Sequence, residues 1–166
     1  PVVADWVRNH APTGQCAIEV IDLAELDLPL LDEPEMASTG VYHHPHTHRW
    51  RDLVISADAI IWVMPEYNGG YPASIKNAID YLYAEWEGKP MAIVGYGYRG
   101  AAVATEQVTA VLRRVKAEVV DGVALRFRDH LDGAPGPEAS IREDAELLGA
   151  GRRMYAALVT AARRHP

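Results

Sequence analysis

Residues 58–83 read DAIIWVM, PEYNGGYP and ASIKNAIDYLY, which are three consecutive segments of different character. Residues 58–64 form a continuous apolar run, the pattern of a β-strand that is buried on both faces. Residues 65–72 are rich in Gly, Pro and Asn, which are residues that favour turns. Residues 73–83 read as an amphipathic helix whose apolar side is formed by Ile75, Ala78, Ile79 and Leu82. The stretch therefore predicts a buried strand, a turn and a helix.

Strands and helices alternate over the rest of the chain. Apolar runs predict further strands over residues 17–23, 90–94 and 119–125, the last interrupted at Asp121 and Gly122. Helical spacing predicts helices over residues 1–10, 47–57, 101–116 and 140–164. Ser140 and Glu143 form a capping-box pattern at the start of the last helix. This alternation predicts an α/β fold with a mostly parallel, doubly wound sheet and helices on both faces, in a single domain over residues 1–166.

Composition and charge narrow the classes of function. The chain has 166 residues, 49% of them hydrophobic, and a formal net charge of −7. Such a surface argues against nucleic-acid binding, which needs Lys and Arg to neutralise phosphates. No apolar run approaches the ~18 residues of a membrane span. The single Cys16 forms no intrachain disulfide, and no signal peptide precedes the first helix. We therefore expect a cytoplasmic protein with neither nucleic acid nor membrane as a partner.

Two loops that follow predicted strands are candidate binding sites, because ligands of open α/β sheets bind beyond the carboxyl ends of the strands. In the first loop, residues 65–72, Asn68 or Gly69 offers a backbone N–H and Tyr67 a ring. In the second loop, residues 95–100 (GYGYRG), the glycines permit close approach of a planar ring and Arg99 adds positive charge. Each loop, taken alone, also fits an ordinary Gly-rich turn before a helix.

Four histidines lie close together in an irregular segment of the chain. His43, His44, His46 and His48 raise the possibility of a metal site. No Cys or carboxylate lies at a recognised ligand spacing within this group, and Pro45 divides it. The favoured interpretation is a surface or interface loop, and a metal-binding protein remains an alternative. No metal ligand and no Ser-His-Asp or Cys-His catalytic set is assigned.

Taken as one unit, residues 65–82 resemble the signature of the NADPH-dependent FMN reductase family, which is close to P-E-Y-N-x-x-x-P-x-x-L-K-N-A-I-D. Ile75 stands where the family has Leu. The resemblance implies a flavodoxin-like fold, FMN as the bound cofactor and NADPH or NADH as the electron donor. It also implies that two groups of residues hold the flavin ring, namely Pro65, Glu66, Tyr67, Asn68 and Gly69 on one side, and Gly95, Tyr96, Gly97 and Arg99 on the other.

The resemblance also implies an activity and an assembly. A family member passes hydride from the nicotinamide to the flavin and then electrons to a small-molecule acceptor, such as a quinone, a flavin, an azo compound or a metal oxyanion. This chemistry belongs to the cofactor, so no catalytic side chain is assigned. A homodimer or homotetramer is expected, with residues 73–82 and the region of Trp86 at a subunit interface. Lys76, Asn77 and Asp80 are expected to be structural.

One family feature is missing from these residues. Family members begin with an apolar strand and a Ser/Arg/Gly-rich loop that holds the FMN phosphate, and their strand order 2-1-3-4-5 places that strand beside residues 58–64. Without it, backbone groups in the middle of the sheet would lack partners. We expect that the chain is incomplete relative to the folded molecule, and the alternatives are a truncated protein or a sheet closed by another chain. The alternative function is a non-enzymatic interaction or regulatory module with weak or no FMN binding.

Overall fold

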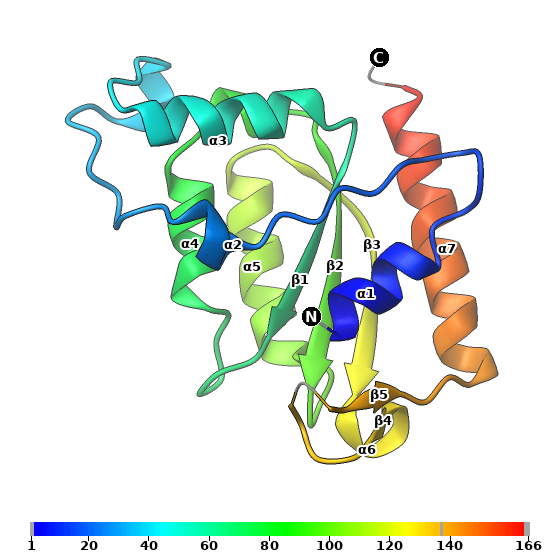
Figure 1. Cartoon of the computed structure of the whole chain (residues 1–166). Helices are drawn as coiled ribbons and strands as arrows, with labels where there is room; N and C mark the ends of the chain where they lie inside the picture. The colour runs from blue at the N-terminus through cyan, green and yellow to red at the C-terminus, as the bar shows by residue number, and fades with distance from the viewer. Residues whose placement is uncertain (1, 137, 165–166) are drawn as a thin grey trace.

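A three-stranded parallel sheet in the order β1-β2-β3 forms the centre of the molecule (Figure 1). The structure, a computed structural model, describes residues 2–136 and 138–164. The strands are β1 (Ile60–Pro65), β2 (Pro90–Gly97) and β3 (Glu118–Arg126). In the register, Ile60 lies opposite Met91, and Gly97 lies opposite Arg126. The predicted parallel α/β architecture is confirmed.

Helices of two size classes surround the sheet. The longer ones are α1 (Val2–Asn9), α3 (Pro45–Ser56), α4 (Ala73–Asp80), α5 (Ala102–Arg114) and α7 (Ala145–Ala162). The short ones are α2 (Leu23–Leu26), η1 (Ala37–Thr39), η2 (Ala84–Trp86) and α6 (Phe127–His130). A small antiparallel pair joins β4 (Leu131–Asp132) to β5 (Ser140–Ile141). Within the described residues, no helix combines the length and hydropathy needed to cross a lipid bilayer.

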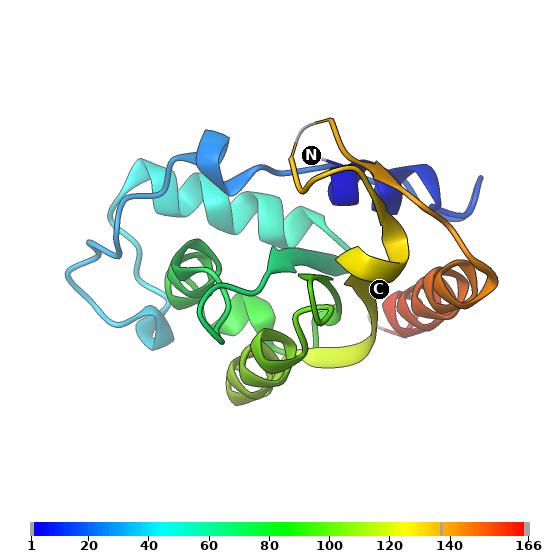
Figure 2. The same cartoon turned by 90° about the horizontal axis from the view of Figure 1, so that it is seen from below.

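The sheet has a hydrophobic core on each face, because side chains alternate along its strands. Met91 and Ile93 of β2 belong to a first core with residues of α3, α4 and α5. Ala92 and Val94 belong to a second core with residues of α1 and α7. Figure 2 shows α5 and α1 on opposite sides of the sheet. The prediction of helices on both faces is therefore confirmed. The strand buried from both sides is β2, whereas the prediction that residues 58–64 are buried on both faces is wrong, because in β1 Trp62 and Met64 are buried and the other residues are partly exposed.

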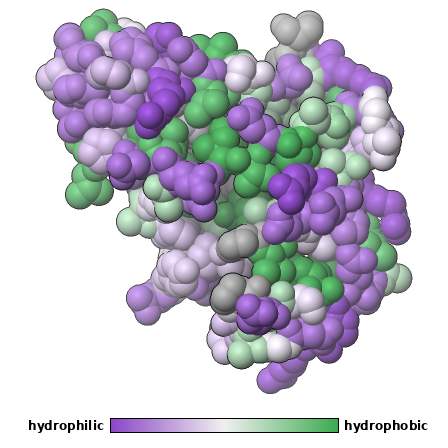
Figure 3. Space-filling model, in the orientation of Figure 1, coloured by the Kyte–Doolittle hydropathy of each residue, from purple (hydrophilic) through white to green (hydrophobic). Residues whose placement is uncertain are grey.

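The prediction of a strand over residues 17–23 is wrong. Residues 16–22 run extended without strand pairing, and α2 begins at Leu23. A strand needs a neighbour for its backbone hydrogen bonds, and in the described part of the chain β1 pairs only with β2. Val20 and Ile21 remain 47% and 36% exposed. Figure 3 shows hydrophobic residues at the surface along the middle of this face of the molecule.

The last helix begins later than the capping-box pattern predicts. Asp144 is the N-cap of α7, and its carboxylate accepts a hydrogen bond from the Leu147 N–H at 2.8 Å. Ser140 instead pairs with Asp132 in the antiparallel β4–β5 pair. The prediction of Ser140 as the N-cap is wrong. The Ser140 backbone is part of β5, and Asp144, directly before the first residue of α7, caps the helix.

Trp86 lies in the core of the chain. Its side chain is fully buried, and the indole N–H donates to the carbonyl groups of Ile79 and Leu82, both at 3.0 Å. Trp86 therefore fills the core between η2 and α4, and the expected subunit interface at residues 73–82 and the region of Trp86 stays a prediction.

Three polar residues of the signature segment have structural contacts, as expected. Lys76 and Asp80 form an ion pair along one side of α4. The Asn77 amide donates to the Pro29 carbonyl at 2.7 Å and accepts from the Leu31 N–H at 2.9 Å. Asn77 thus holds the segment before α3 against α4.

Candidate functional site

The loop after β1 contains a tight turn at residues 67–70. The Tyr67 N–H donates to the Gly70 carbonyl at 2.9 Å, and the Gly70 N–H donates to the Tyr67 carbonyl at 3.0 Å. Asn68 and Gly69 have φ values of 51° and 75°. Positive φ at both central residues defines a type I′ turn, for which an Asn-Gly pair is the favoured sequence. The sequence therefore explains the shape of this loop.

The tip of this turn presents hydrogen-bond donors to solvent. Tyr67, Asn68 and Gly69 are exposed. Among the described residues, no acceptor binds the backbone N–H of Asn68 or of Gly69. The Gly69 carbonyl, in contrast, accepts a hydrogen bond from the Gln107 amide at 3.1 Å. The tip is thus suited to the acceptor-rich edge of a bound ring.

Glu66 contacts a helix rather than the exposed side of the loop. One carboxylate oxygen accepts hydrogen bonds from the Val103 N–H at 3.0 Å and the Ala104 N–H at 3.2 Å. These are the second and third residues of α5, whose own N-cap residue, Ala101, supplies no side-chain hydrogen bond. Glu66, which lies in the loop after β1, therefore supplies the capping side chain at the N-terminus of α5.

The second loop is shorter than predicted, because β2 continues to Gly97. Gly95 is buried, and a Cβ there would lie 2.8 Å from the Gly100 carbonyl oxygen. Gly95 thus allows the loop to fold back over the strand and offers no surface of its own to a ligand. Gly97 differs, since its φ of +151° favours glycine and nothing but the Ala101 nitrogen, 4.0 Å away, would meet an added Cβ. The space around the Cβ position of Gly97 is therefore open.

Aromatic rings surround this strand end. Tyr96 and Tyr98 both contact Phe127, with ring centroids 6.3 Å and 5.5 Å apart. Burial, and secondarily electrostatic interaction with Tyr67, raises the pKa of Tyr96. The two candidate loops follow adjacent strands, since Pro65 lies opposite Tyr96 in the register. Arg99 is exposed, and no ion pair with it is found among the described residues.

The predicted site residues thus divide into two groups. All of them except the buried Gly95 are exposed or half-exposed, and those that remain candidates for contact with a ligand are Tyr67, Asn68, Gly69, Tyr96, Gly97 and Arg99. Pro65 ends β1, and Glu66 and Gly95 shape the loops from behind. Sequence reasoning missed Gln107 and Phe127, because their contacts with the loops depend on the fold and no local pattern marks them.

The histidine segment forms contacts within the chain. His46 Nε2 lies 3.0 Å from Asp32 Oδ1, and His43 Nε2 lies 3.2 Å from Glu35 Oε1. The His44 ring stacks on His46 with centroids 5.1 Å apart. In the described part of the chain, no three His, Cys, Asp or Glu side chains come together in a way that could hold a metal ion. These contacts attach residues 32–35 to the start of α3.

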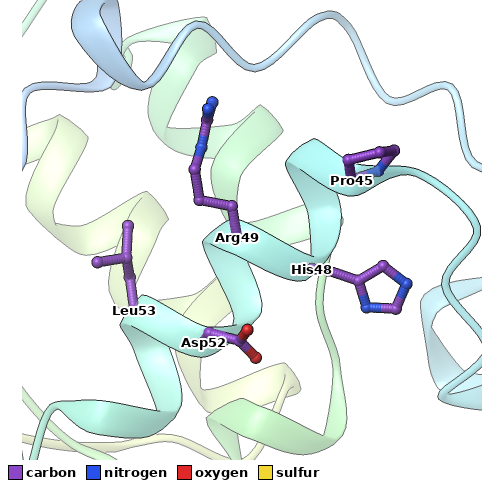
Figure 4. A pocket seen from close by; sticks show the side chains of 5 residues that line it. All are labelled: Pro45, His48, Arg49, Asp52 and Leu53. Carbon is purple, nitrogen blue, oxygen red and sulfur yellow. The ribbon is translucent and has the colours of Figure 1, made fainter.

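The outer surface of α3 has a shallow hollow, which lies away from the two strand-end loops. Its lining side chains point in different directions (Figure 4) and are Pro45, His48, Arg49, Asp52 and Leu53. Arg49 is already engaged, since its guanidinium donates to the Leu26 carbonyl at 2.7 Å. The hollow therefore presents no convergent set of groups, and the carboxyl end of the sheet is the better candidate site.

Comparisons of sequence identify relatives of the chain. A family model described as NADPH-dependent FMN reductase matches residues 1–129. An NAD(P)H-dependent FMN reductase of Saccharomyces cerevisiae is 40% identical over 139 residues, covering 76% of this chain and 73% of the yeast protein. An NAD(P)H-dependent FMN reductase of Schizosaccharomyces pombe is 39% identical over 122 residues, covering 72% of this chain and 61% of that protein. The chain thus matches part of the length of each relative.

Comparison of structures supports the same architecture. The flavoenzyme FerB, an NAD(P)H:(acceptor) oxidoreductase from Paracoccus denitrificans, superposes with a TM-score of 0.72 and 24% sequence identity. The match covers 98% of this chain and 88% of FerB. The fold is therefore the flavodoxin-like, doubly wound arrangement that the sequence predicts.

Proposed function

Since the chain belongs to the NADPH-dependent FMN reductase family, we propose that it binds FMN at the carboxyl end of its sheet and oxidises NAD(P)H. FMN, when bound, accepts hydride from the nicotinamide and passes electrons to a small-molecule acceptor. The acceptor is a quinone, a free flavin, an azo compound or a metal oxyanion. The protein contributes position and electrostatics, and no side chain is assigned as acid or base.

The observation that carries the proposal is the pairing of the 67–70 turn with the end of β2. The turn offers two backbone N–H donors, those of Asn68 and Gly69, that no described residue binds. A flavin ring has acceptor atoms along its polar edge, so donors of this kind suit it. Gly97 ends the neighbouring strand β2, where Pro65 of β1 lies opposite Tyr96, and the space around its Cβ position is open. Together these features fit a flat ligand with one polar edge.

Aromatic and charged groups complete the proposed ring site. Tyr67 and Tyr98 are 64% and 79% exposed, which leaves their rings free to pack on a flat ligand and exclude water from it. Arg99 supplies a positive charge that favours the reduced, more electron-rich form of a bound ring and attracts the phosphates of the nicotinamide donor. Glu66 and Gly95 act indirectly, through the shape of the two loops.

The assembly and compartment complete the proposal. The chain forms a single domain over residues 1–166 that works in the cytoplasm as a homodimer or homotetramer. Light scattering of the purified protein during size-exclusion chromatography tests the assembly directly, and a monomer at all concentrations would contradict it.

The function is tested by adding FMN to the purified protein and recording its absorbance spectrum, then adding NADPH or NADH under air-free conditions. The proposal predicts a protein-bound flavin that loses its yellow colour with one or both donors and regains it when a quinone or azo dye is added. A protein that takes up no FMN and does not oxidise either donor would refute the proposal.

A further inference from the structure

Two hydrogen-bonded contacts connect the 67–70 turn to helix α5. The first joins Glu66 to the N–H groups of Val103 and Ala104, and the second joins the Gln107 amide to the Gly69 carbonyl. We refer to Glu66 and Gln107 together as the loop clasp. The contacts span 37 and 38 residues of sequence, so they fix loop positions that the local sequence leaves open.

Each half of the clasp restrains a different part of the loop. Glu66 immediately precedes the turn and is itself attached to α5, and Gln107 holds the Gly69 carbonyl group at the tip. Gln107 also lies over the end of the turn, since an added Cβ on Gly70 would approach its side-chain oxygen to 3.4 Å. A turn that is held at both places has a single orientation relative to α5.

The clasp also determines which groups of the turn face a ligand. The Gly69 carbonyl accepts a hydrogen bond from Gln107. The N–H and carbonyl groups of Tyr67 and Gly70 hydrogen-bond to each other within the turn. The donors that remain unbound by any described residue are the N–H groups of Asn68 and Gly69. The first turn of α5, meanwhile, is filled by the Glu66 carboxylate and is not an open anion site.

We propose that Glu66 and Gln107 are positioning residues that orient the 67–70 turn for the flavin ring, and that neither touches the ring. This inference rests on the proposed FMN-binding function and deepens it. In this account the negative charge of Glu66 is compensated by the N-terminus of α5. Its hydrogen-bonding capacity, rather than its charge, is what the ring site requires.

The test compares four purified variants with the wild-type protein: Glu66→Ala, Glu66→Gln, Gln107→Ala and the double variant Glu66→Ala/Gln107→Ala. Glu106→Gln is the matched control, because Glu106 is exposed on α5 beside Gln107 and outside the clasp. FMN affinity is measured by quenching of flavin fluorescence, and the orientation of the bound ring by visible circular dichroism. Amide exchange of Val103 and Ala104 is measured without FMN.

We expect Glu66→Ala to weaken FMN binding about tenfold or more, because small displacements of a positioning group are costly. Glu66→Gln, which keeps an acceptor oxygen for α5, should restore most of that affinity and the circular dichroism of the bound ring. Both alanine changes loosen the same turn, so the double variant should lose less than the product of the two single losses. In the ligand-free protein, Val103 and Ala104 should exchange faster in Glu66→Ala than in Glu66→Gln.

Two results would overturn the inference. Equal loss of affinity in Glu66→Gln and Glu66→Ala would show that the charge of Glu66 acts on the ligand directly. Unchanged affinity in both alanine variants would show that the clasp does not position the ring. If the wild-type protein took up no FMN, the proposed function would fail, whereas the amide exchange of α5 would still report separately on whether Glu66 caps the helix.

Discussion

At the scale of single residues, Gly97 is the position where backbone geometry and the candidate site coincide. Its φ of +151° is a conformation that residues with a side chain rarely adopt, and the space around it is open. The glycine therefore has two roles, since it permits the turn out of β2 and leaves room for a planar ligand.

We predict that Gly97→Ala lowers stability by about 1–3 kcal/mol through backbone strain and weakens FMN binding, because the new Cβ enters the open space. Gly149→Ala in α7 is the matched control, since its Cβ meets only the flexible Arg153 side chain, at 3.4 Å. The control should be neutral or stabilising by up to ~1 kcal/mol. Urea unfolding and FMN titration check both variants, and wild-type values for Gly97→Ala would contradict the prediction.

At the scale of secondary-structure elements, the N-terminus of α7 has a pH-dependent cap. The hydrogen bond from the Leu147 N–H, followed by the charge of the nearby His130, lowers the pKa of Asp144 below its ordinary value of 3.8. A carboxyl group whose pKa is lower in the folded state stabilises that state above its unfolded pKa. The stabilisation is then lost as the pH falls through the folded pKa.

We predict that wild-type protein has a higher Tm than Asp144→Asn at neutral pH, because Asn keeps a capping oxygen but loses the charge. The difference in Tm should shrink as the pH falls below about 4, where the Asp144 carboxylate becomes protonated. Thermal unfolding followed by circular dichroism at several pH values measures it. A difference that persists unchanged at the lowest pH would show that the ionised carboxylate is not its cause.

The start of α3 depends on one carboxylate from the preceding segment. Glu33 accepts hydrogen bonds from the N–H groups of His43 and His44, at 2.8 Å and 3.0 Å. We predict that Glu33→Ala makes residues 30–44 more sensitive to limited proteolysis and speeds amide exchange at these two histidines. Glu35→Ala is the control, because the Glu35 carboxylate hydrogen-bonds to the exposed His43 ring and, among the described residues, accepts from no backbone N–H at the start of α3. Equal cleavage rates in the two variants would contradict this role of Glu33.

Elements with a strong local pattern were predicted correctly, and those that depend on distant partners were not. The apolar run that forms β1 and the amphipathic spacing of α4 identify both elements. Residues 17–23, whose hydrophobic residues also predict a strand, form none, because local hydrophobicity does not say whether a neighbouring strand is present. Ser140 similarly matches a capping pattern, but its pairing with Asp132 prevails.

The candidate site was predictable to a similar extent. The Asn-Gly pair determines the I′ turn, so the sequence places free donors at its tip. The buried position of Gly95 and the α5-capping role of Glu66 were not predictable, because both arise from packing between separate segments. A motif thus locates the loop, and contacts remote in sequence decide which of its residues face a ligand.

At the scale of the whole molecule, a hydrophobic core lies on each face of the sheet. Each core contains at least one tryptophan, so fluorescence can follow the unfolding of one core separately from the other. Trp6 lies in the core beneath α1 and α7, whereas Trp50, Trp62 and Trp86 lie in the core beneath α3, α4 and α5. Fluorescence of a Trp6→Phe variant therefore follows the first core alone, and circular dichroism follows the secondary structure of the whole molecule.

We predict that the two cores unfold together, as expected for a single domain. In the Trp6→Phe background, Leu112→Ala in α5 and Leu158→Ala in α7 should each destabilise the protein by about 2–5 kcal/mol, with coincident transitions in both probes. Both leucines are buried, at 0% and 4% exposure. Separate fluorescence and circular dichroism transitions for Leu158→Ala would show that the two faces of the sheet unfold independently.

The central claim is that the flavin ring binds between the 67–70 turn and the end of β2. A crystal structure of the protein grown with FMN tests it most directly. Our account predicts the ring beside Gly97, its polar edge bound by the N–H groups of Asn68 and Gly69, and Glu66 still capping α5. A flavin bound elsewhere on the molecule, or a ring in direct contact with the Glu66 carboxylate, would contradict the account.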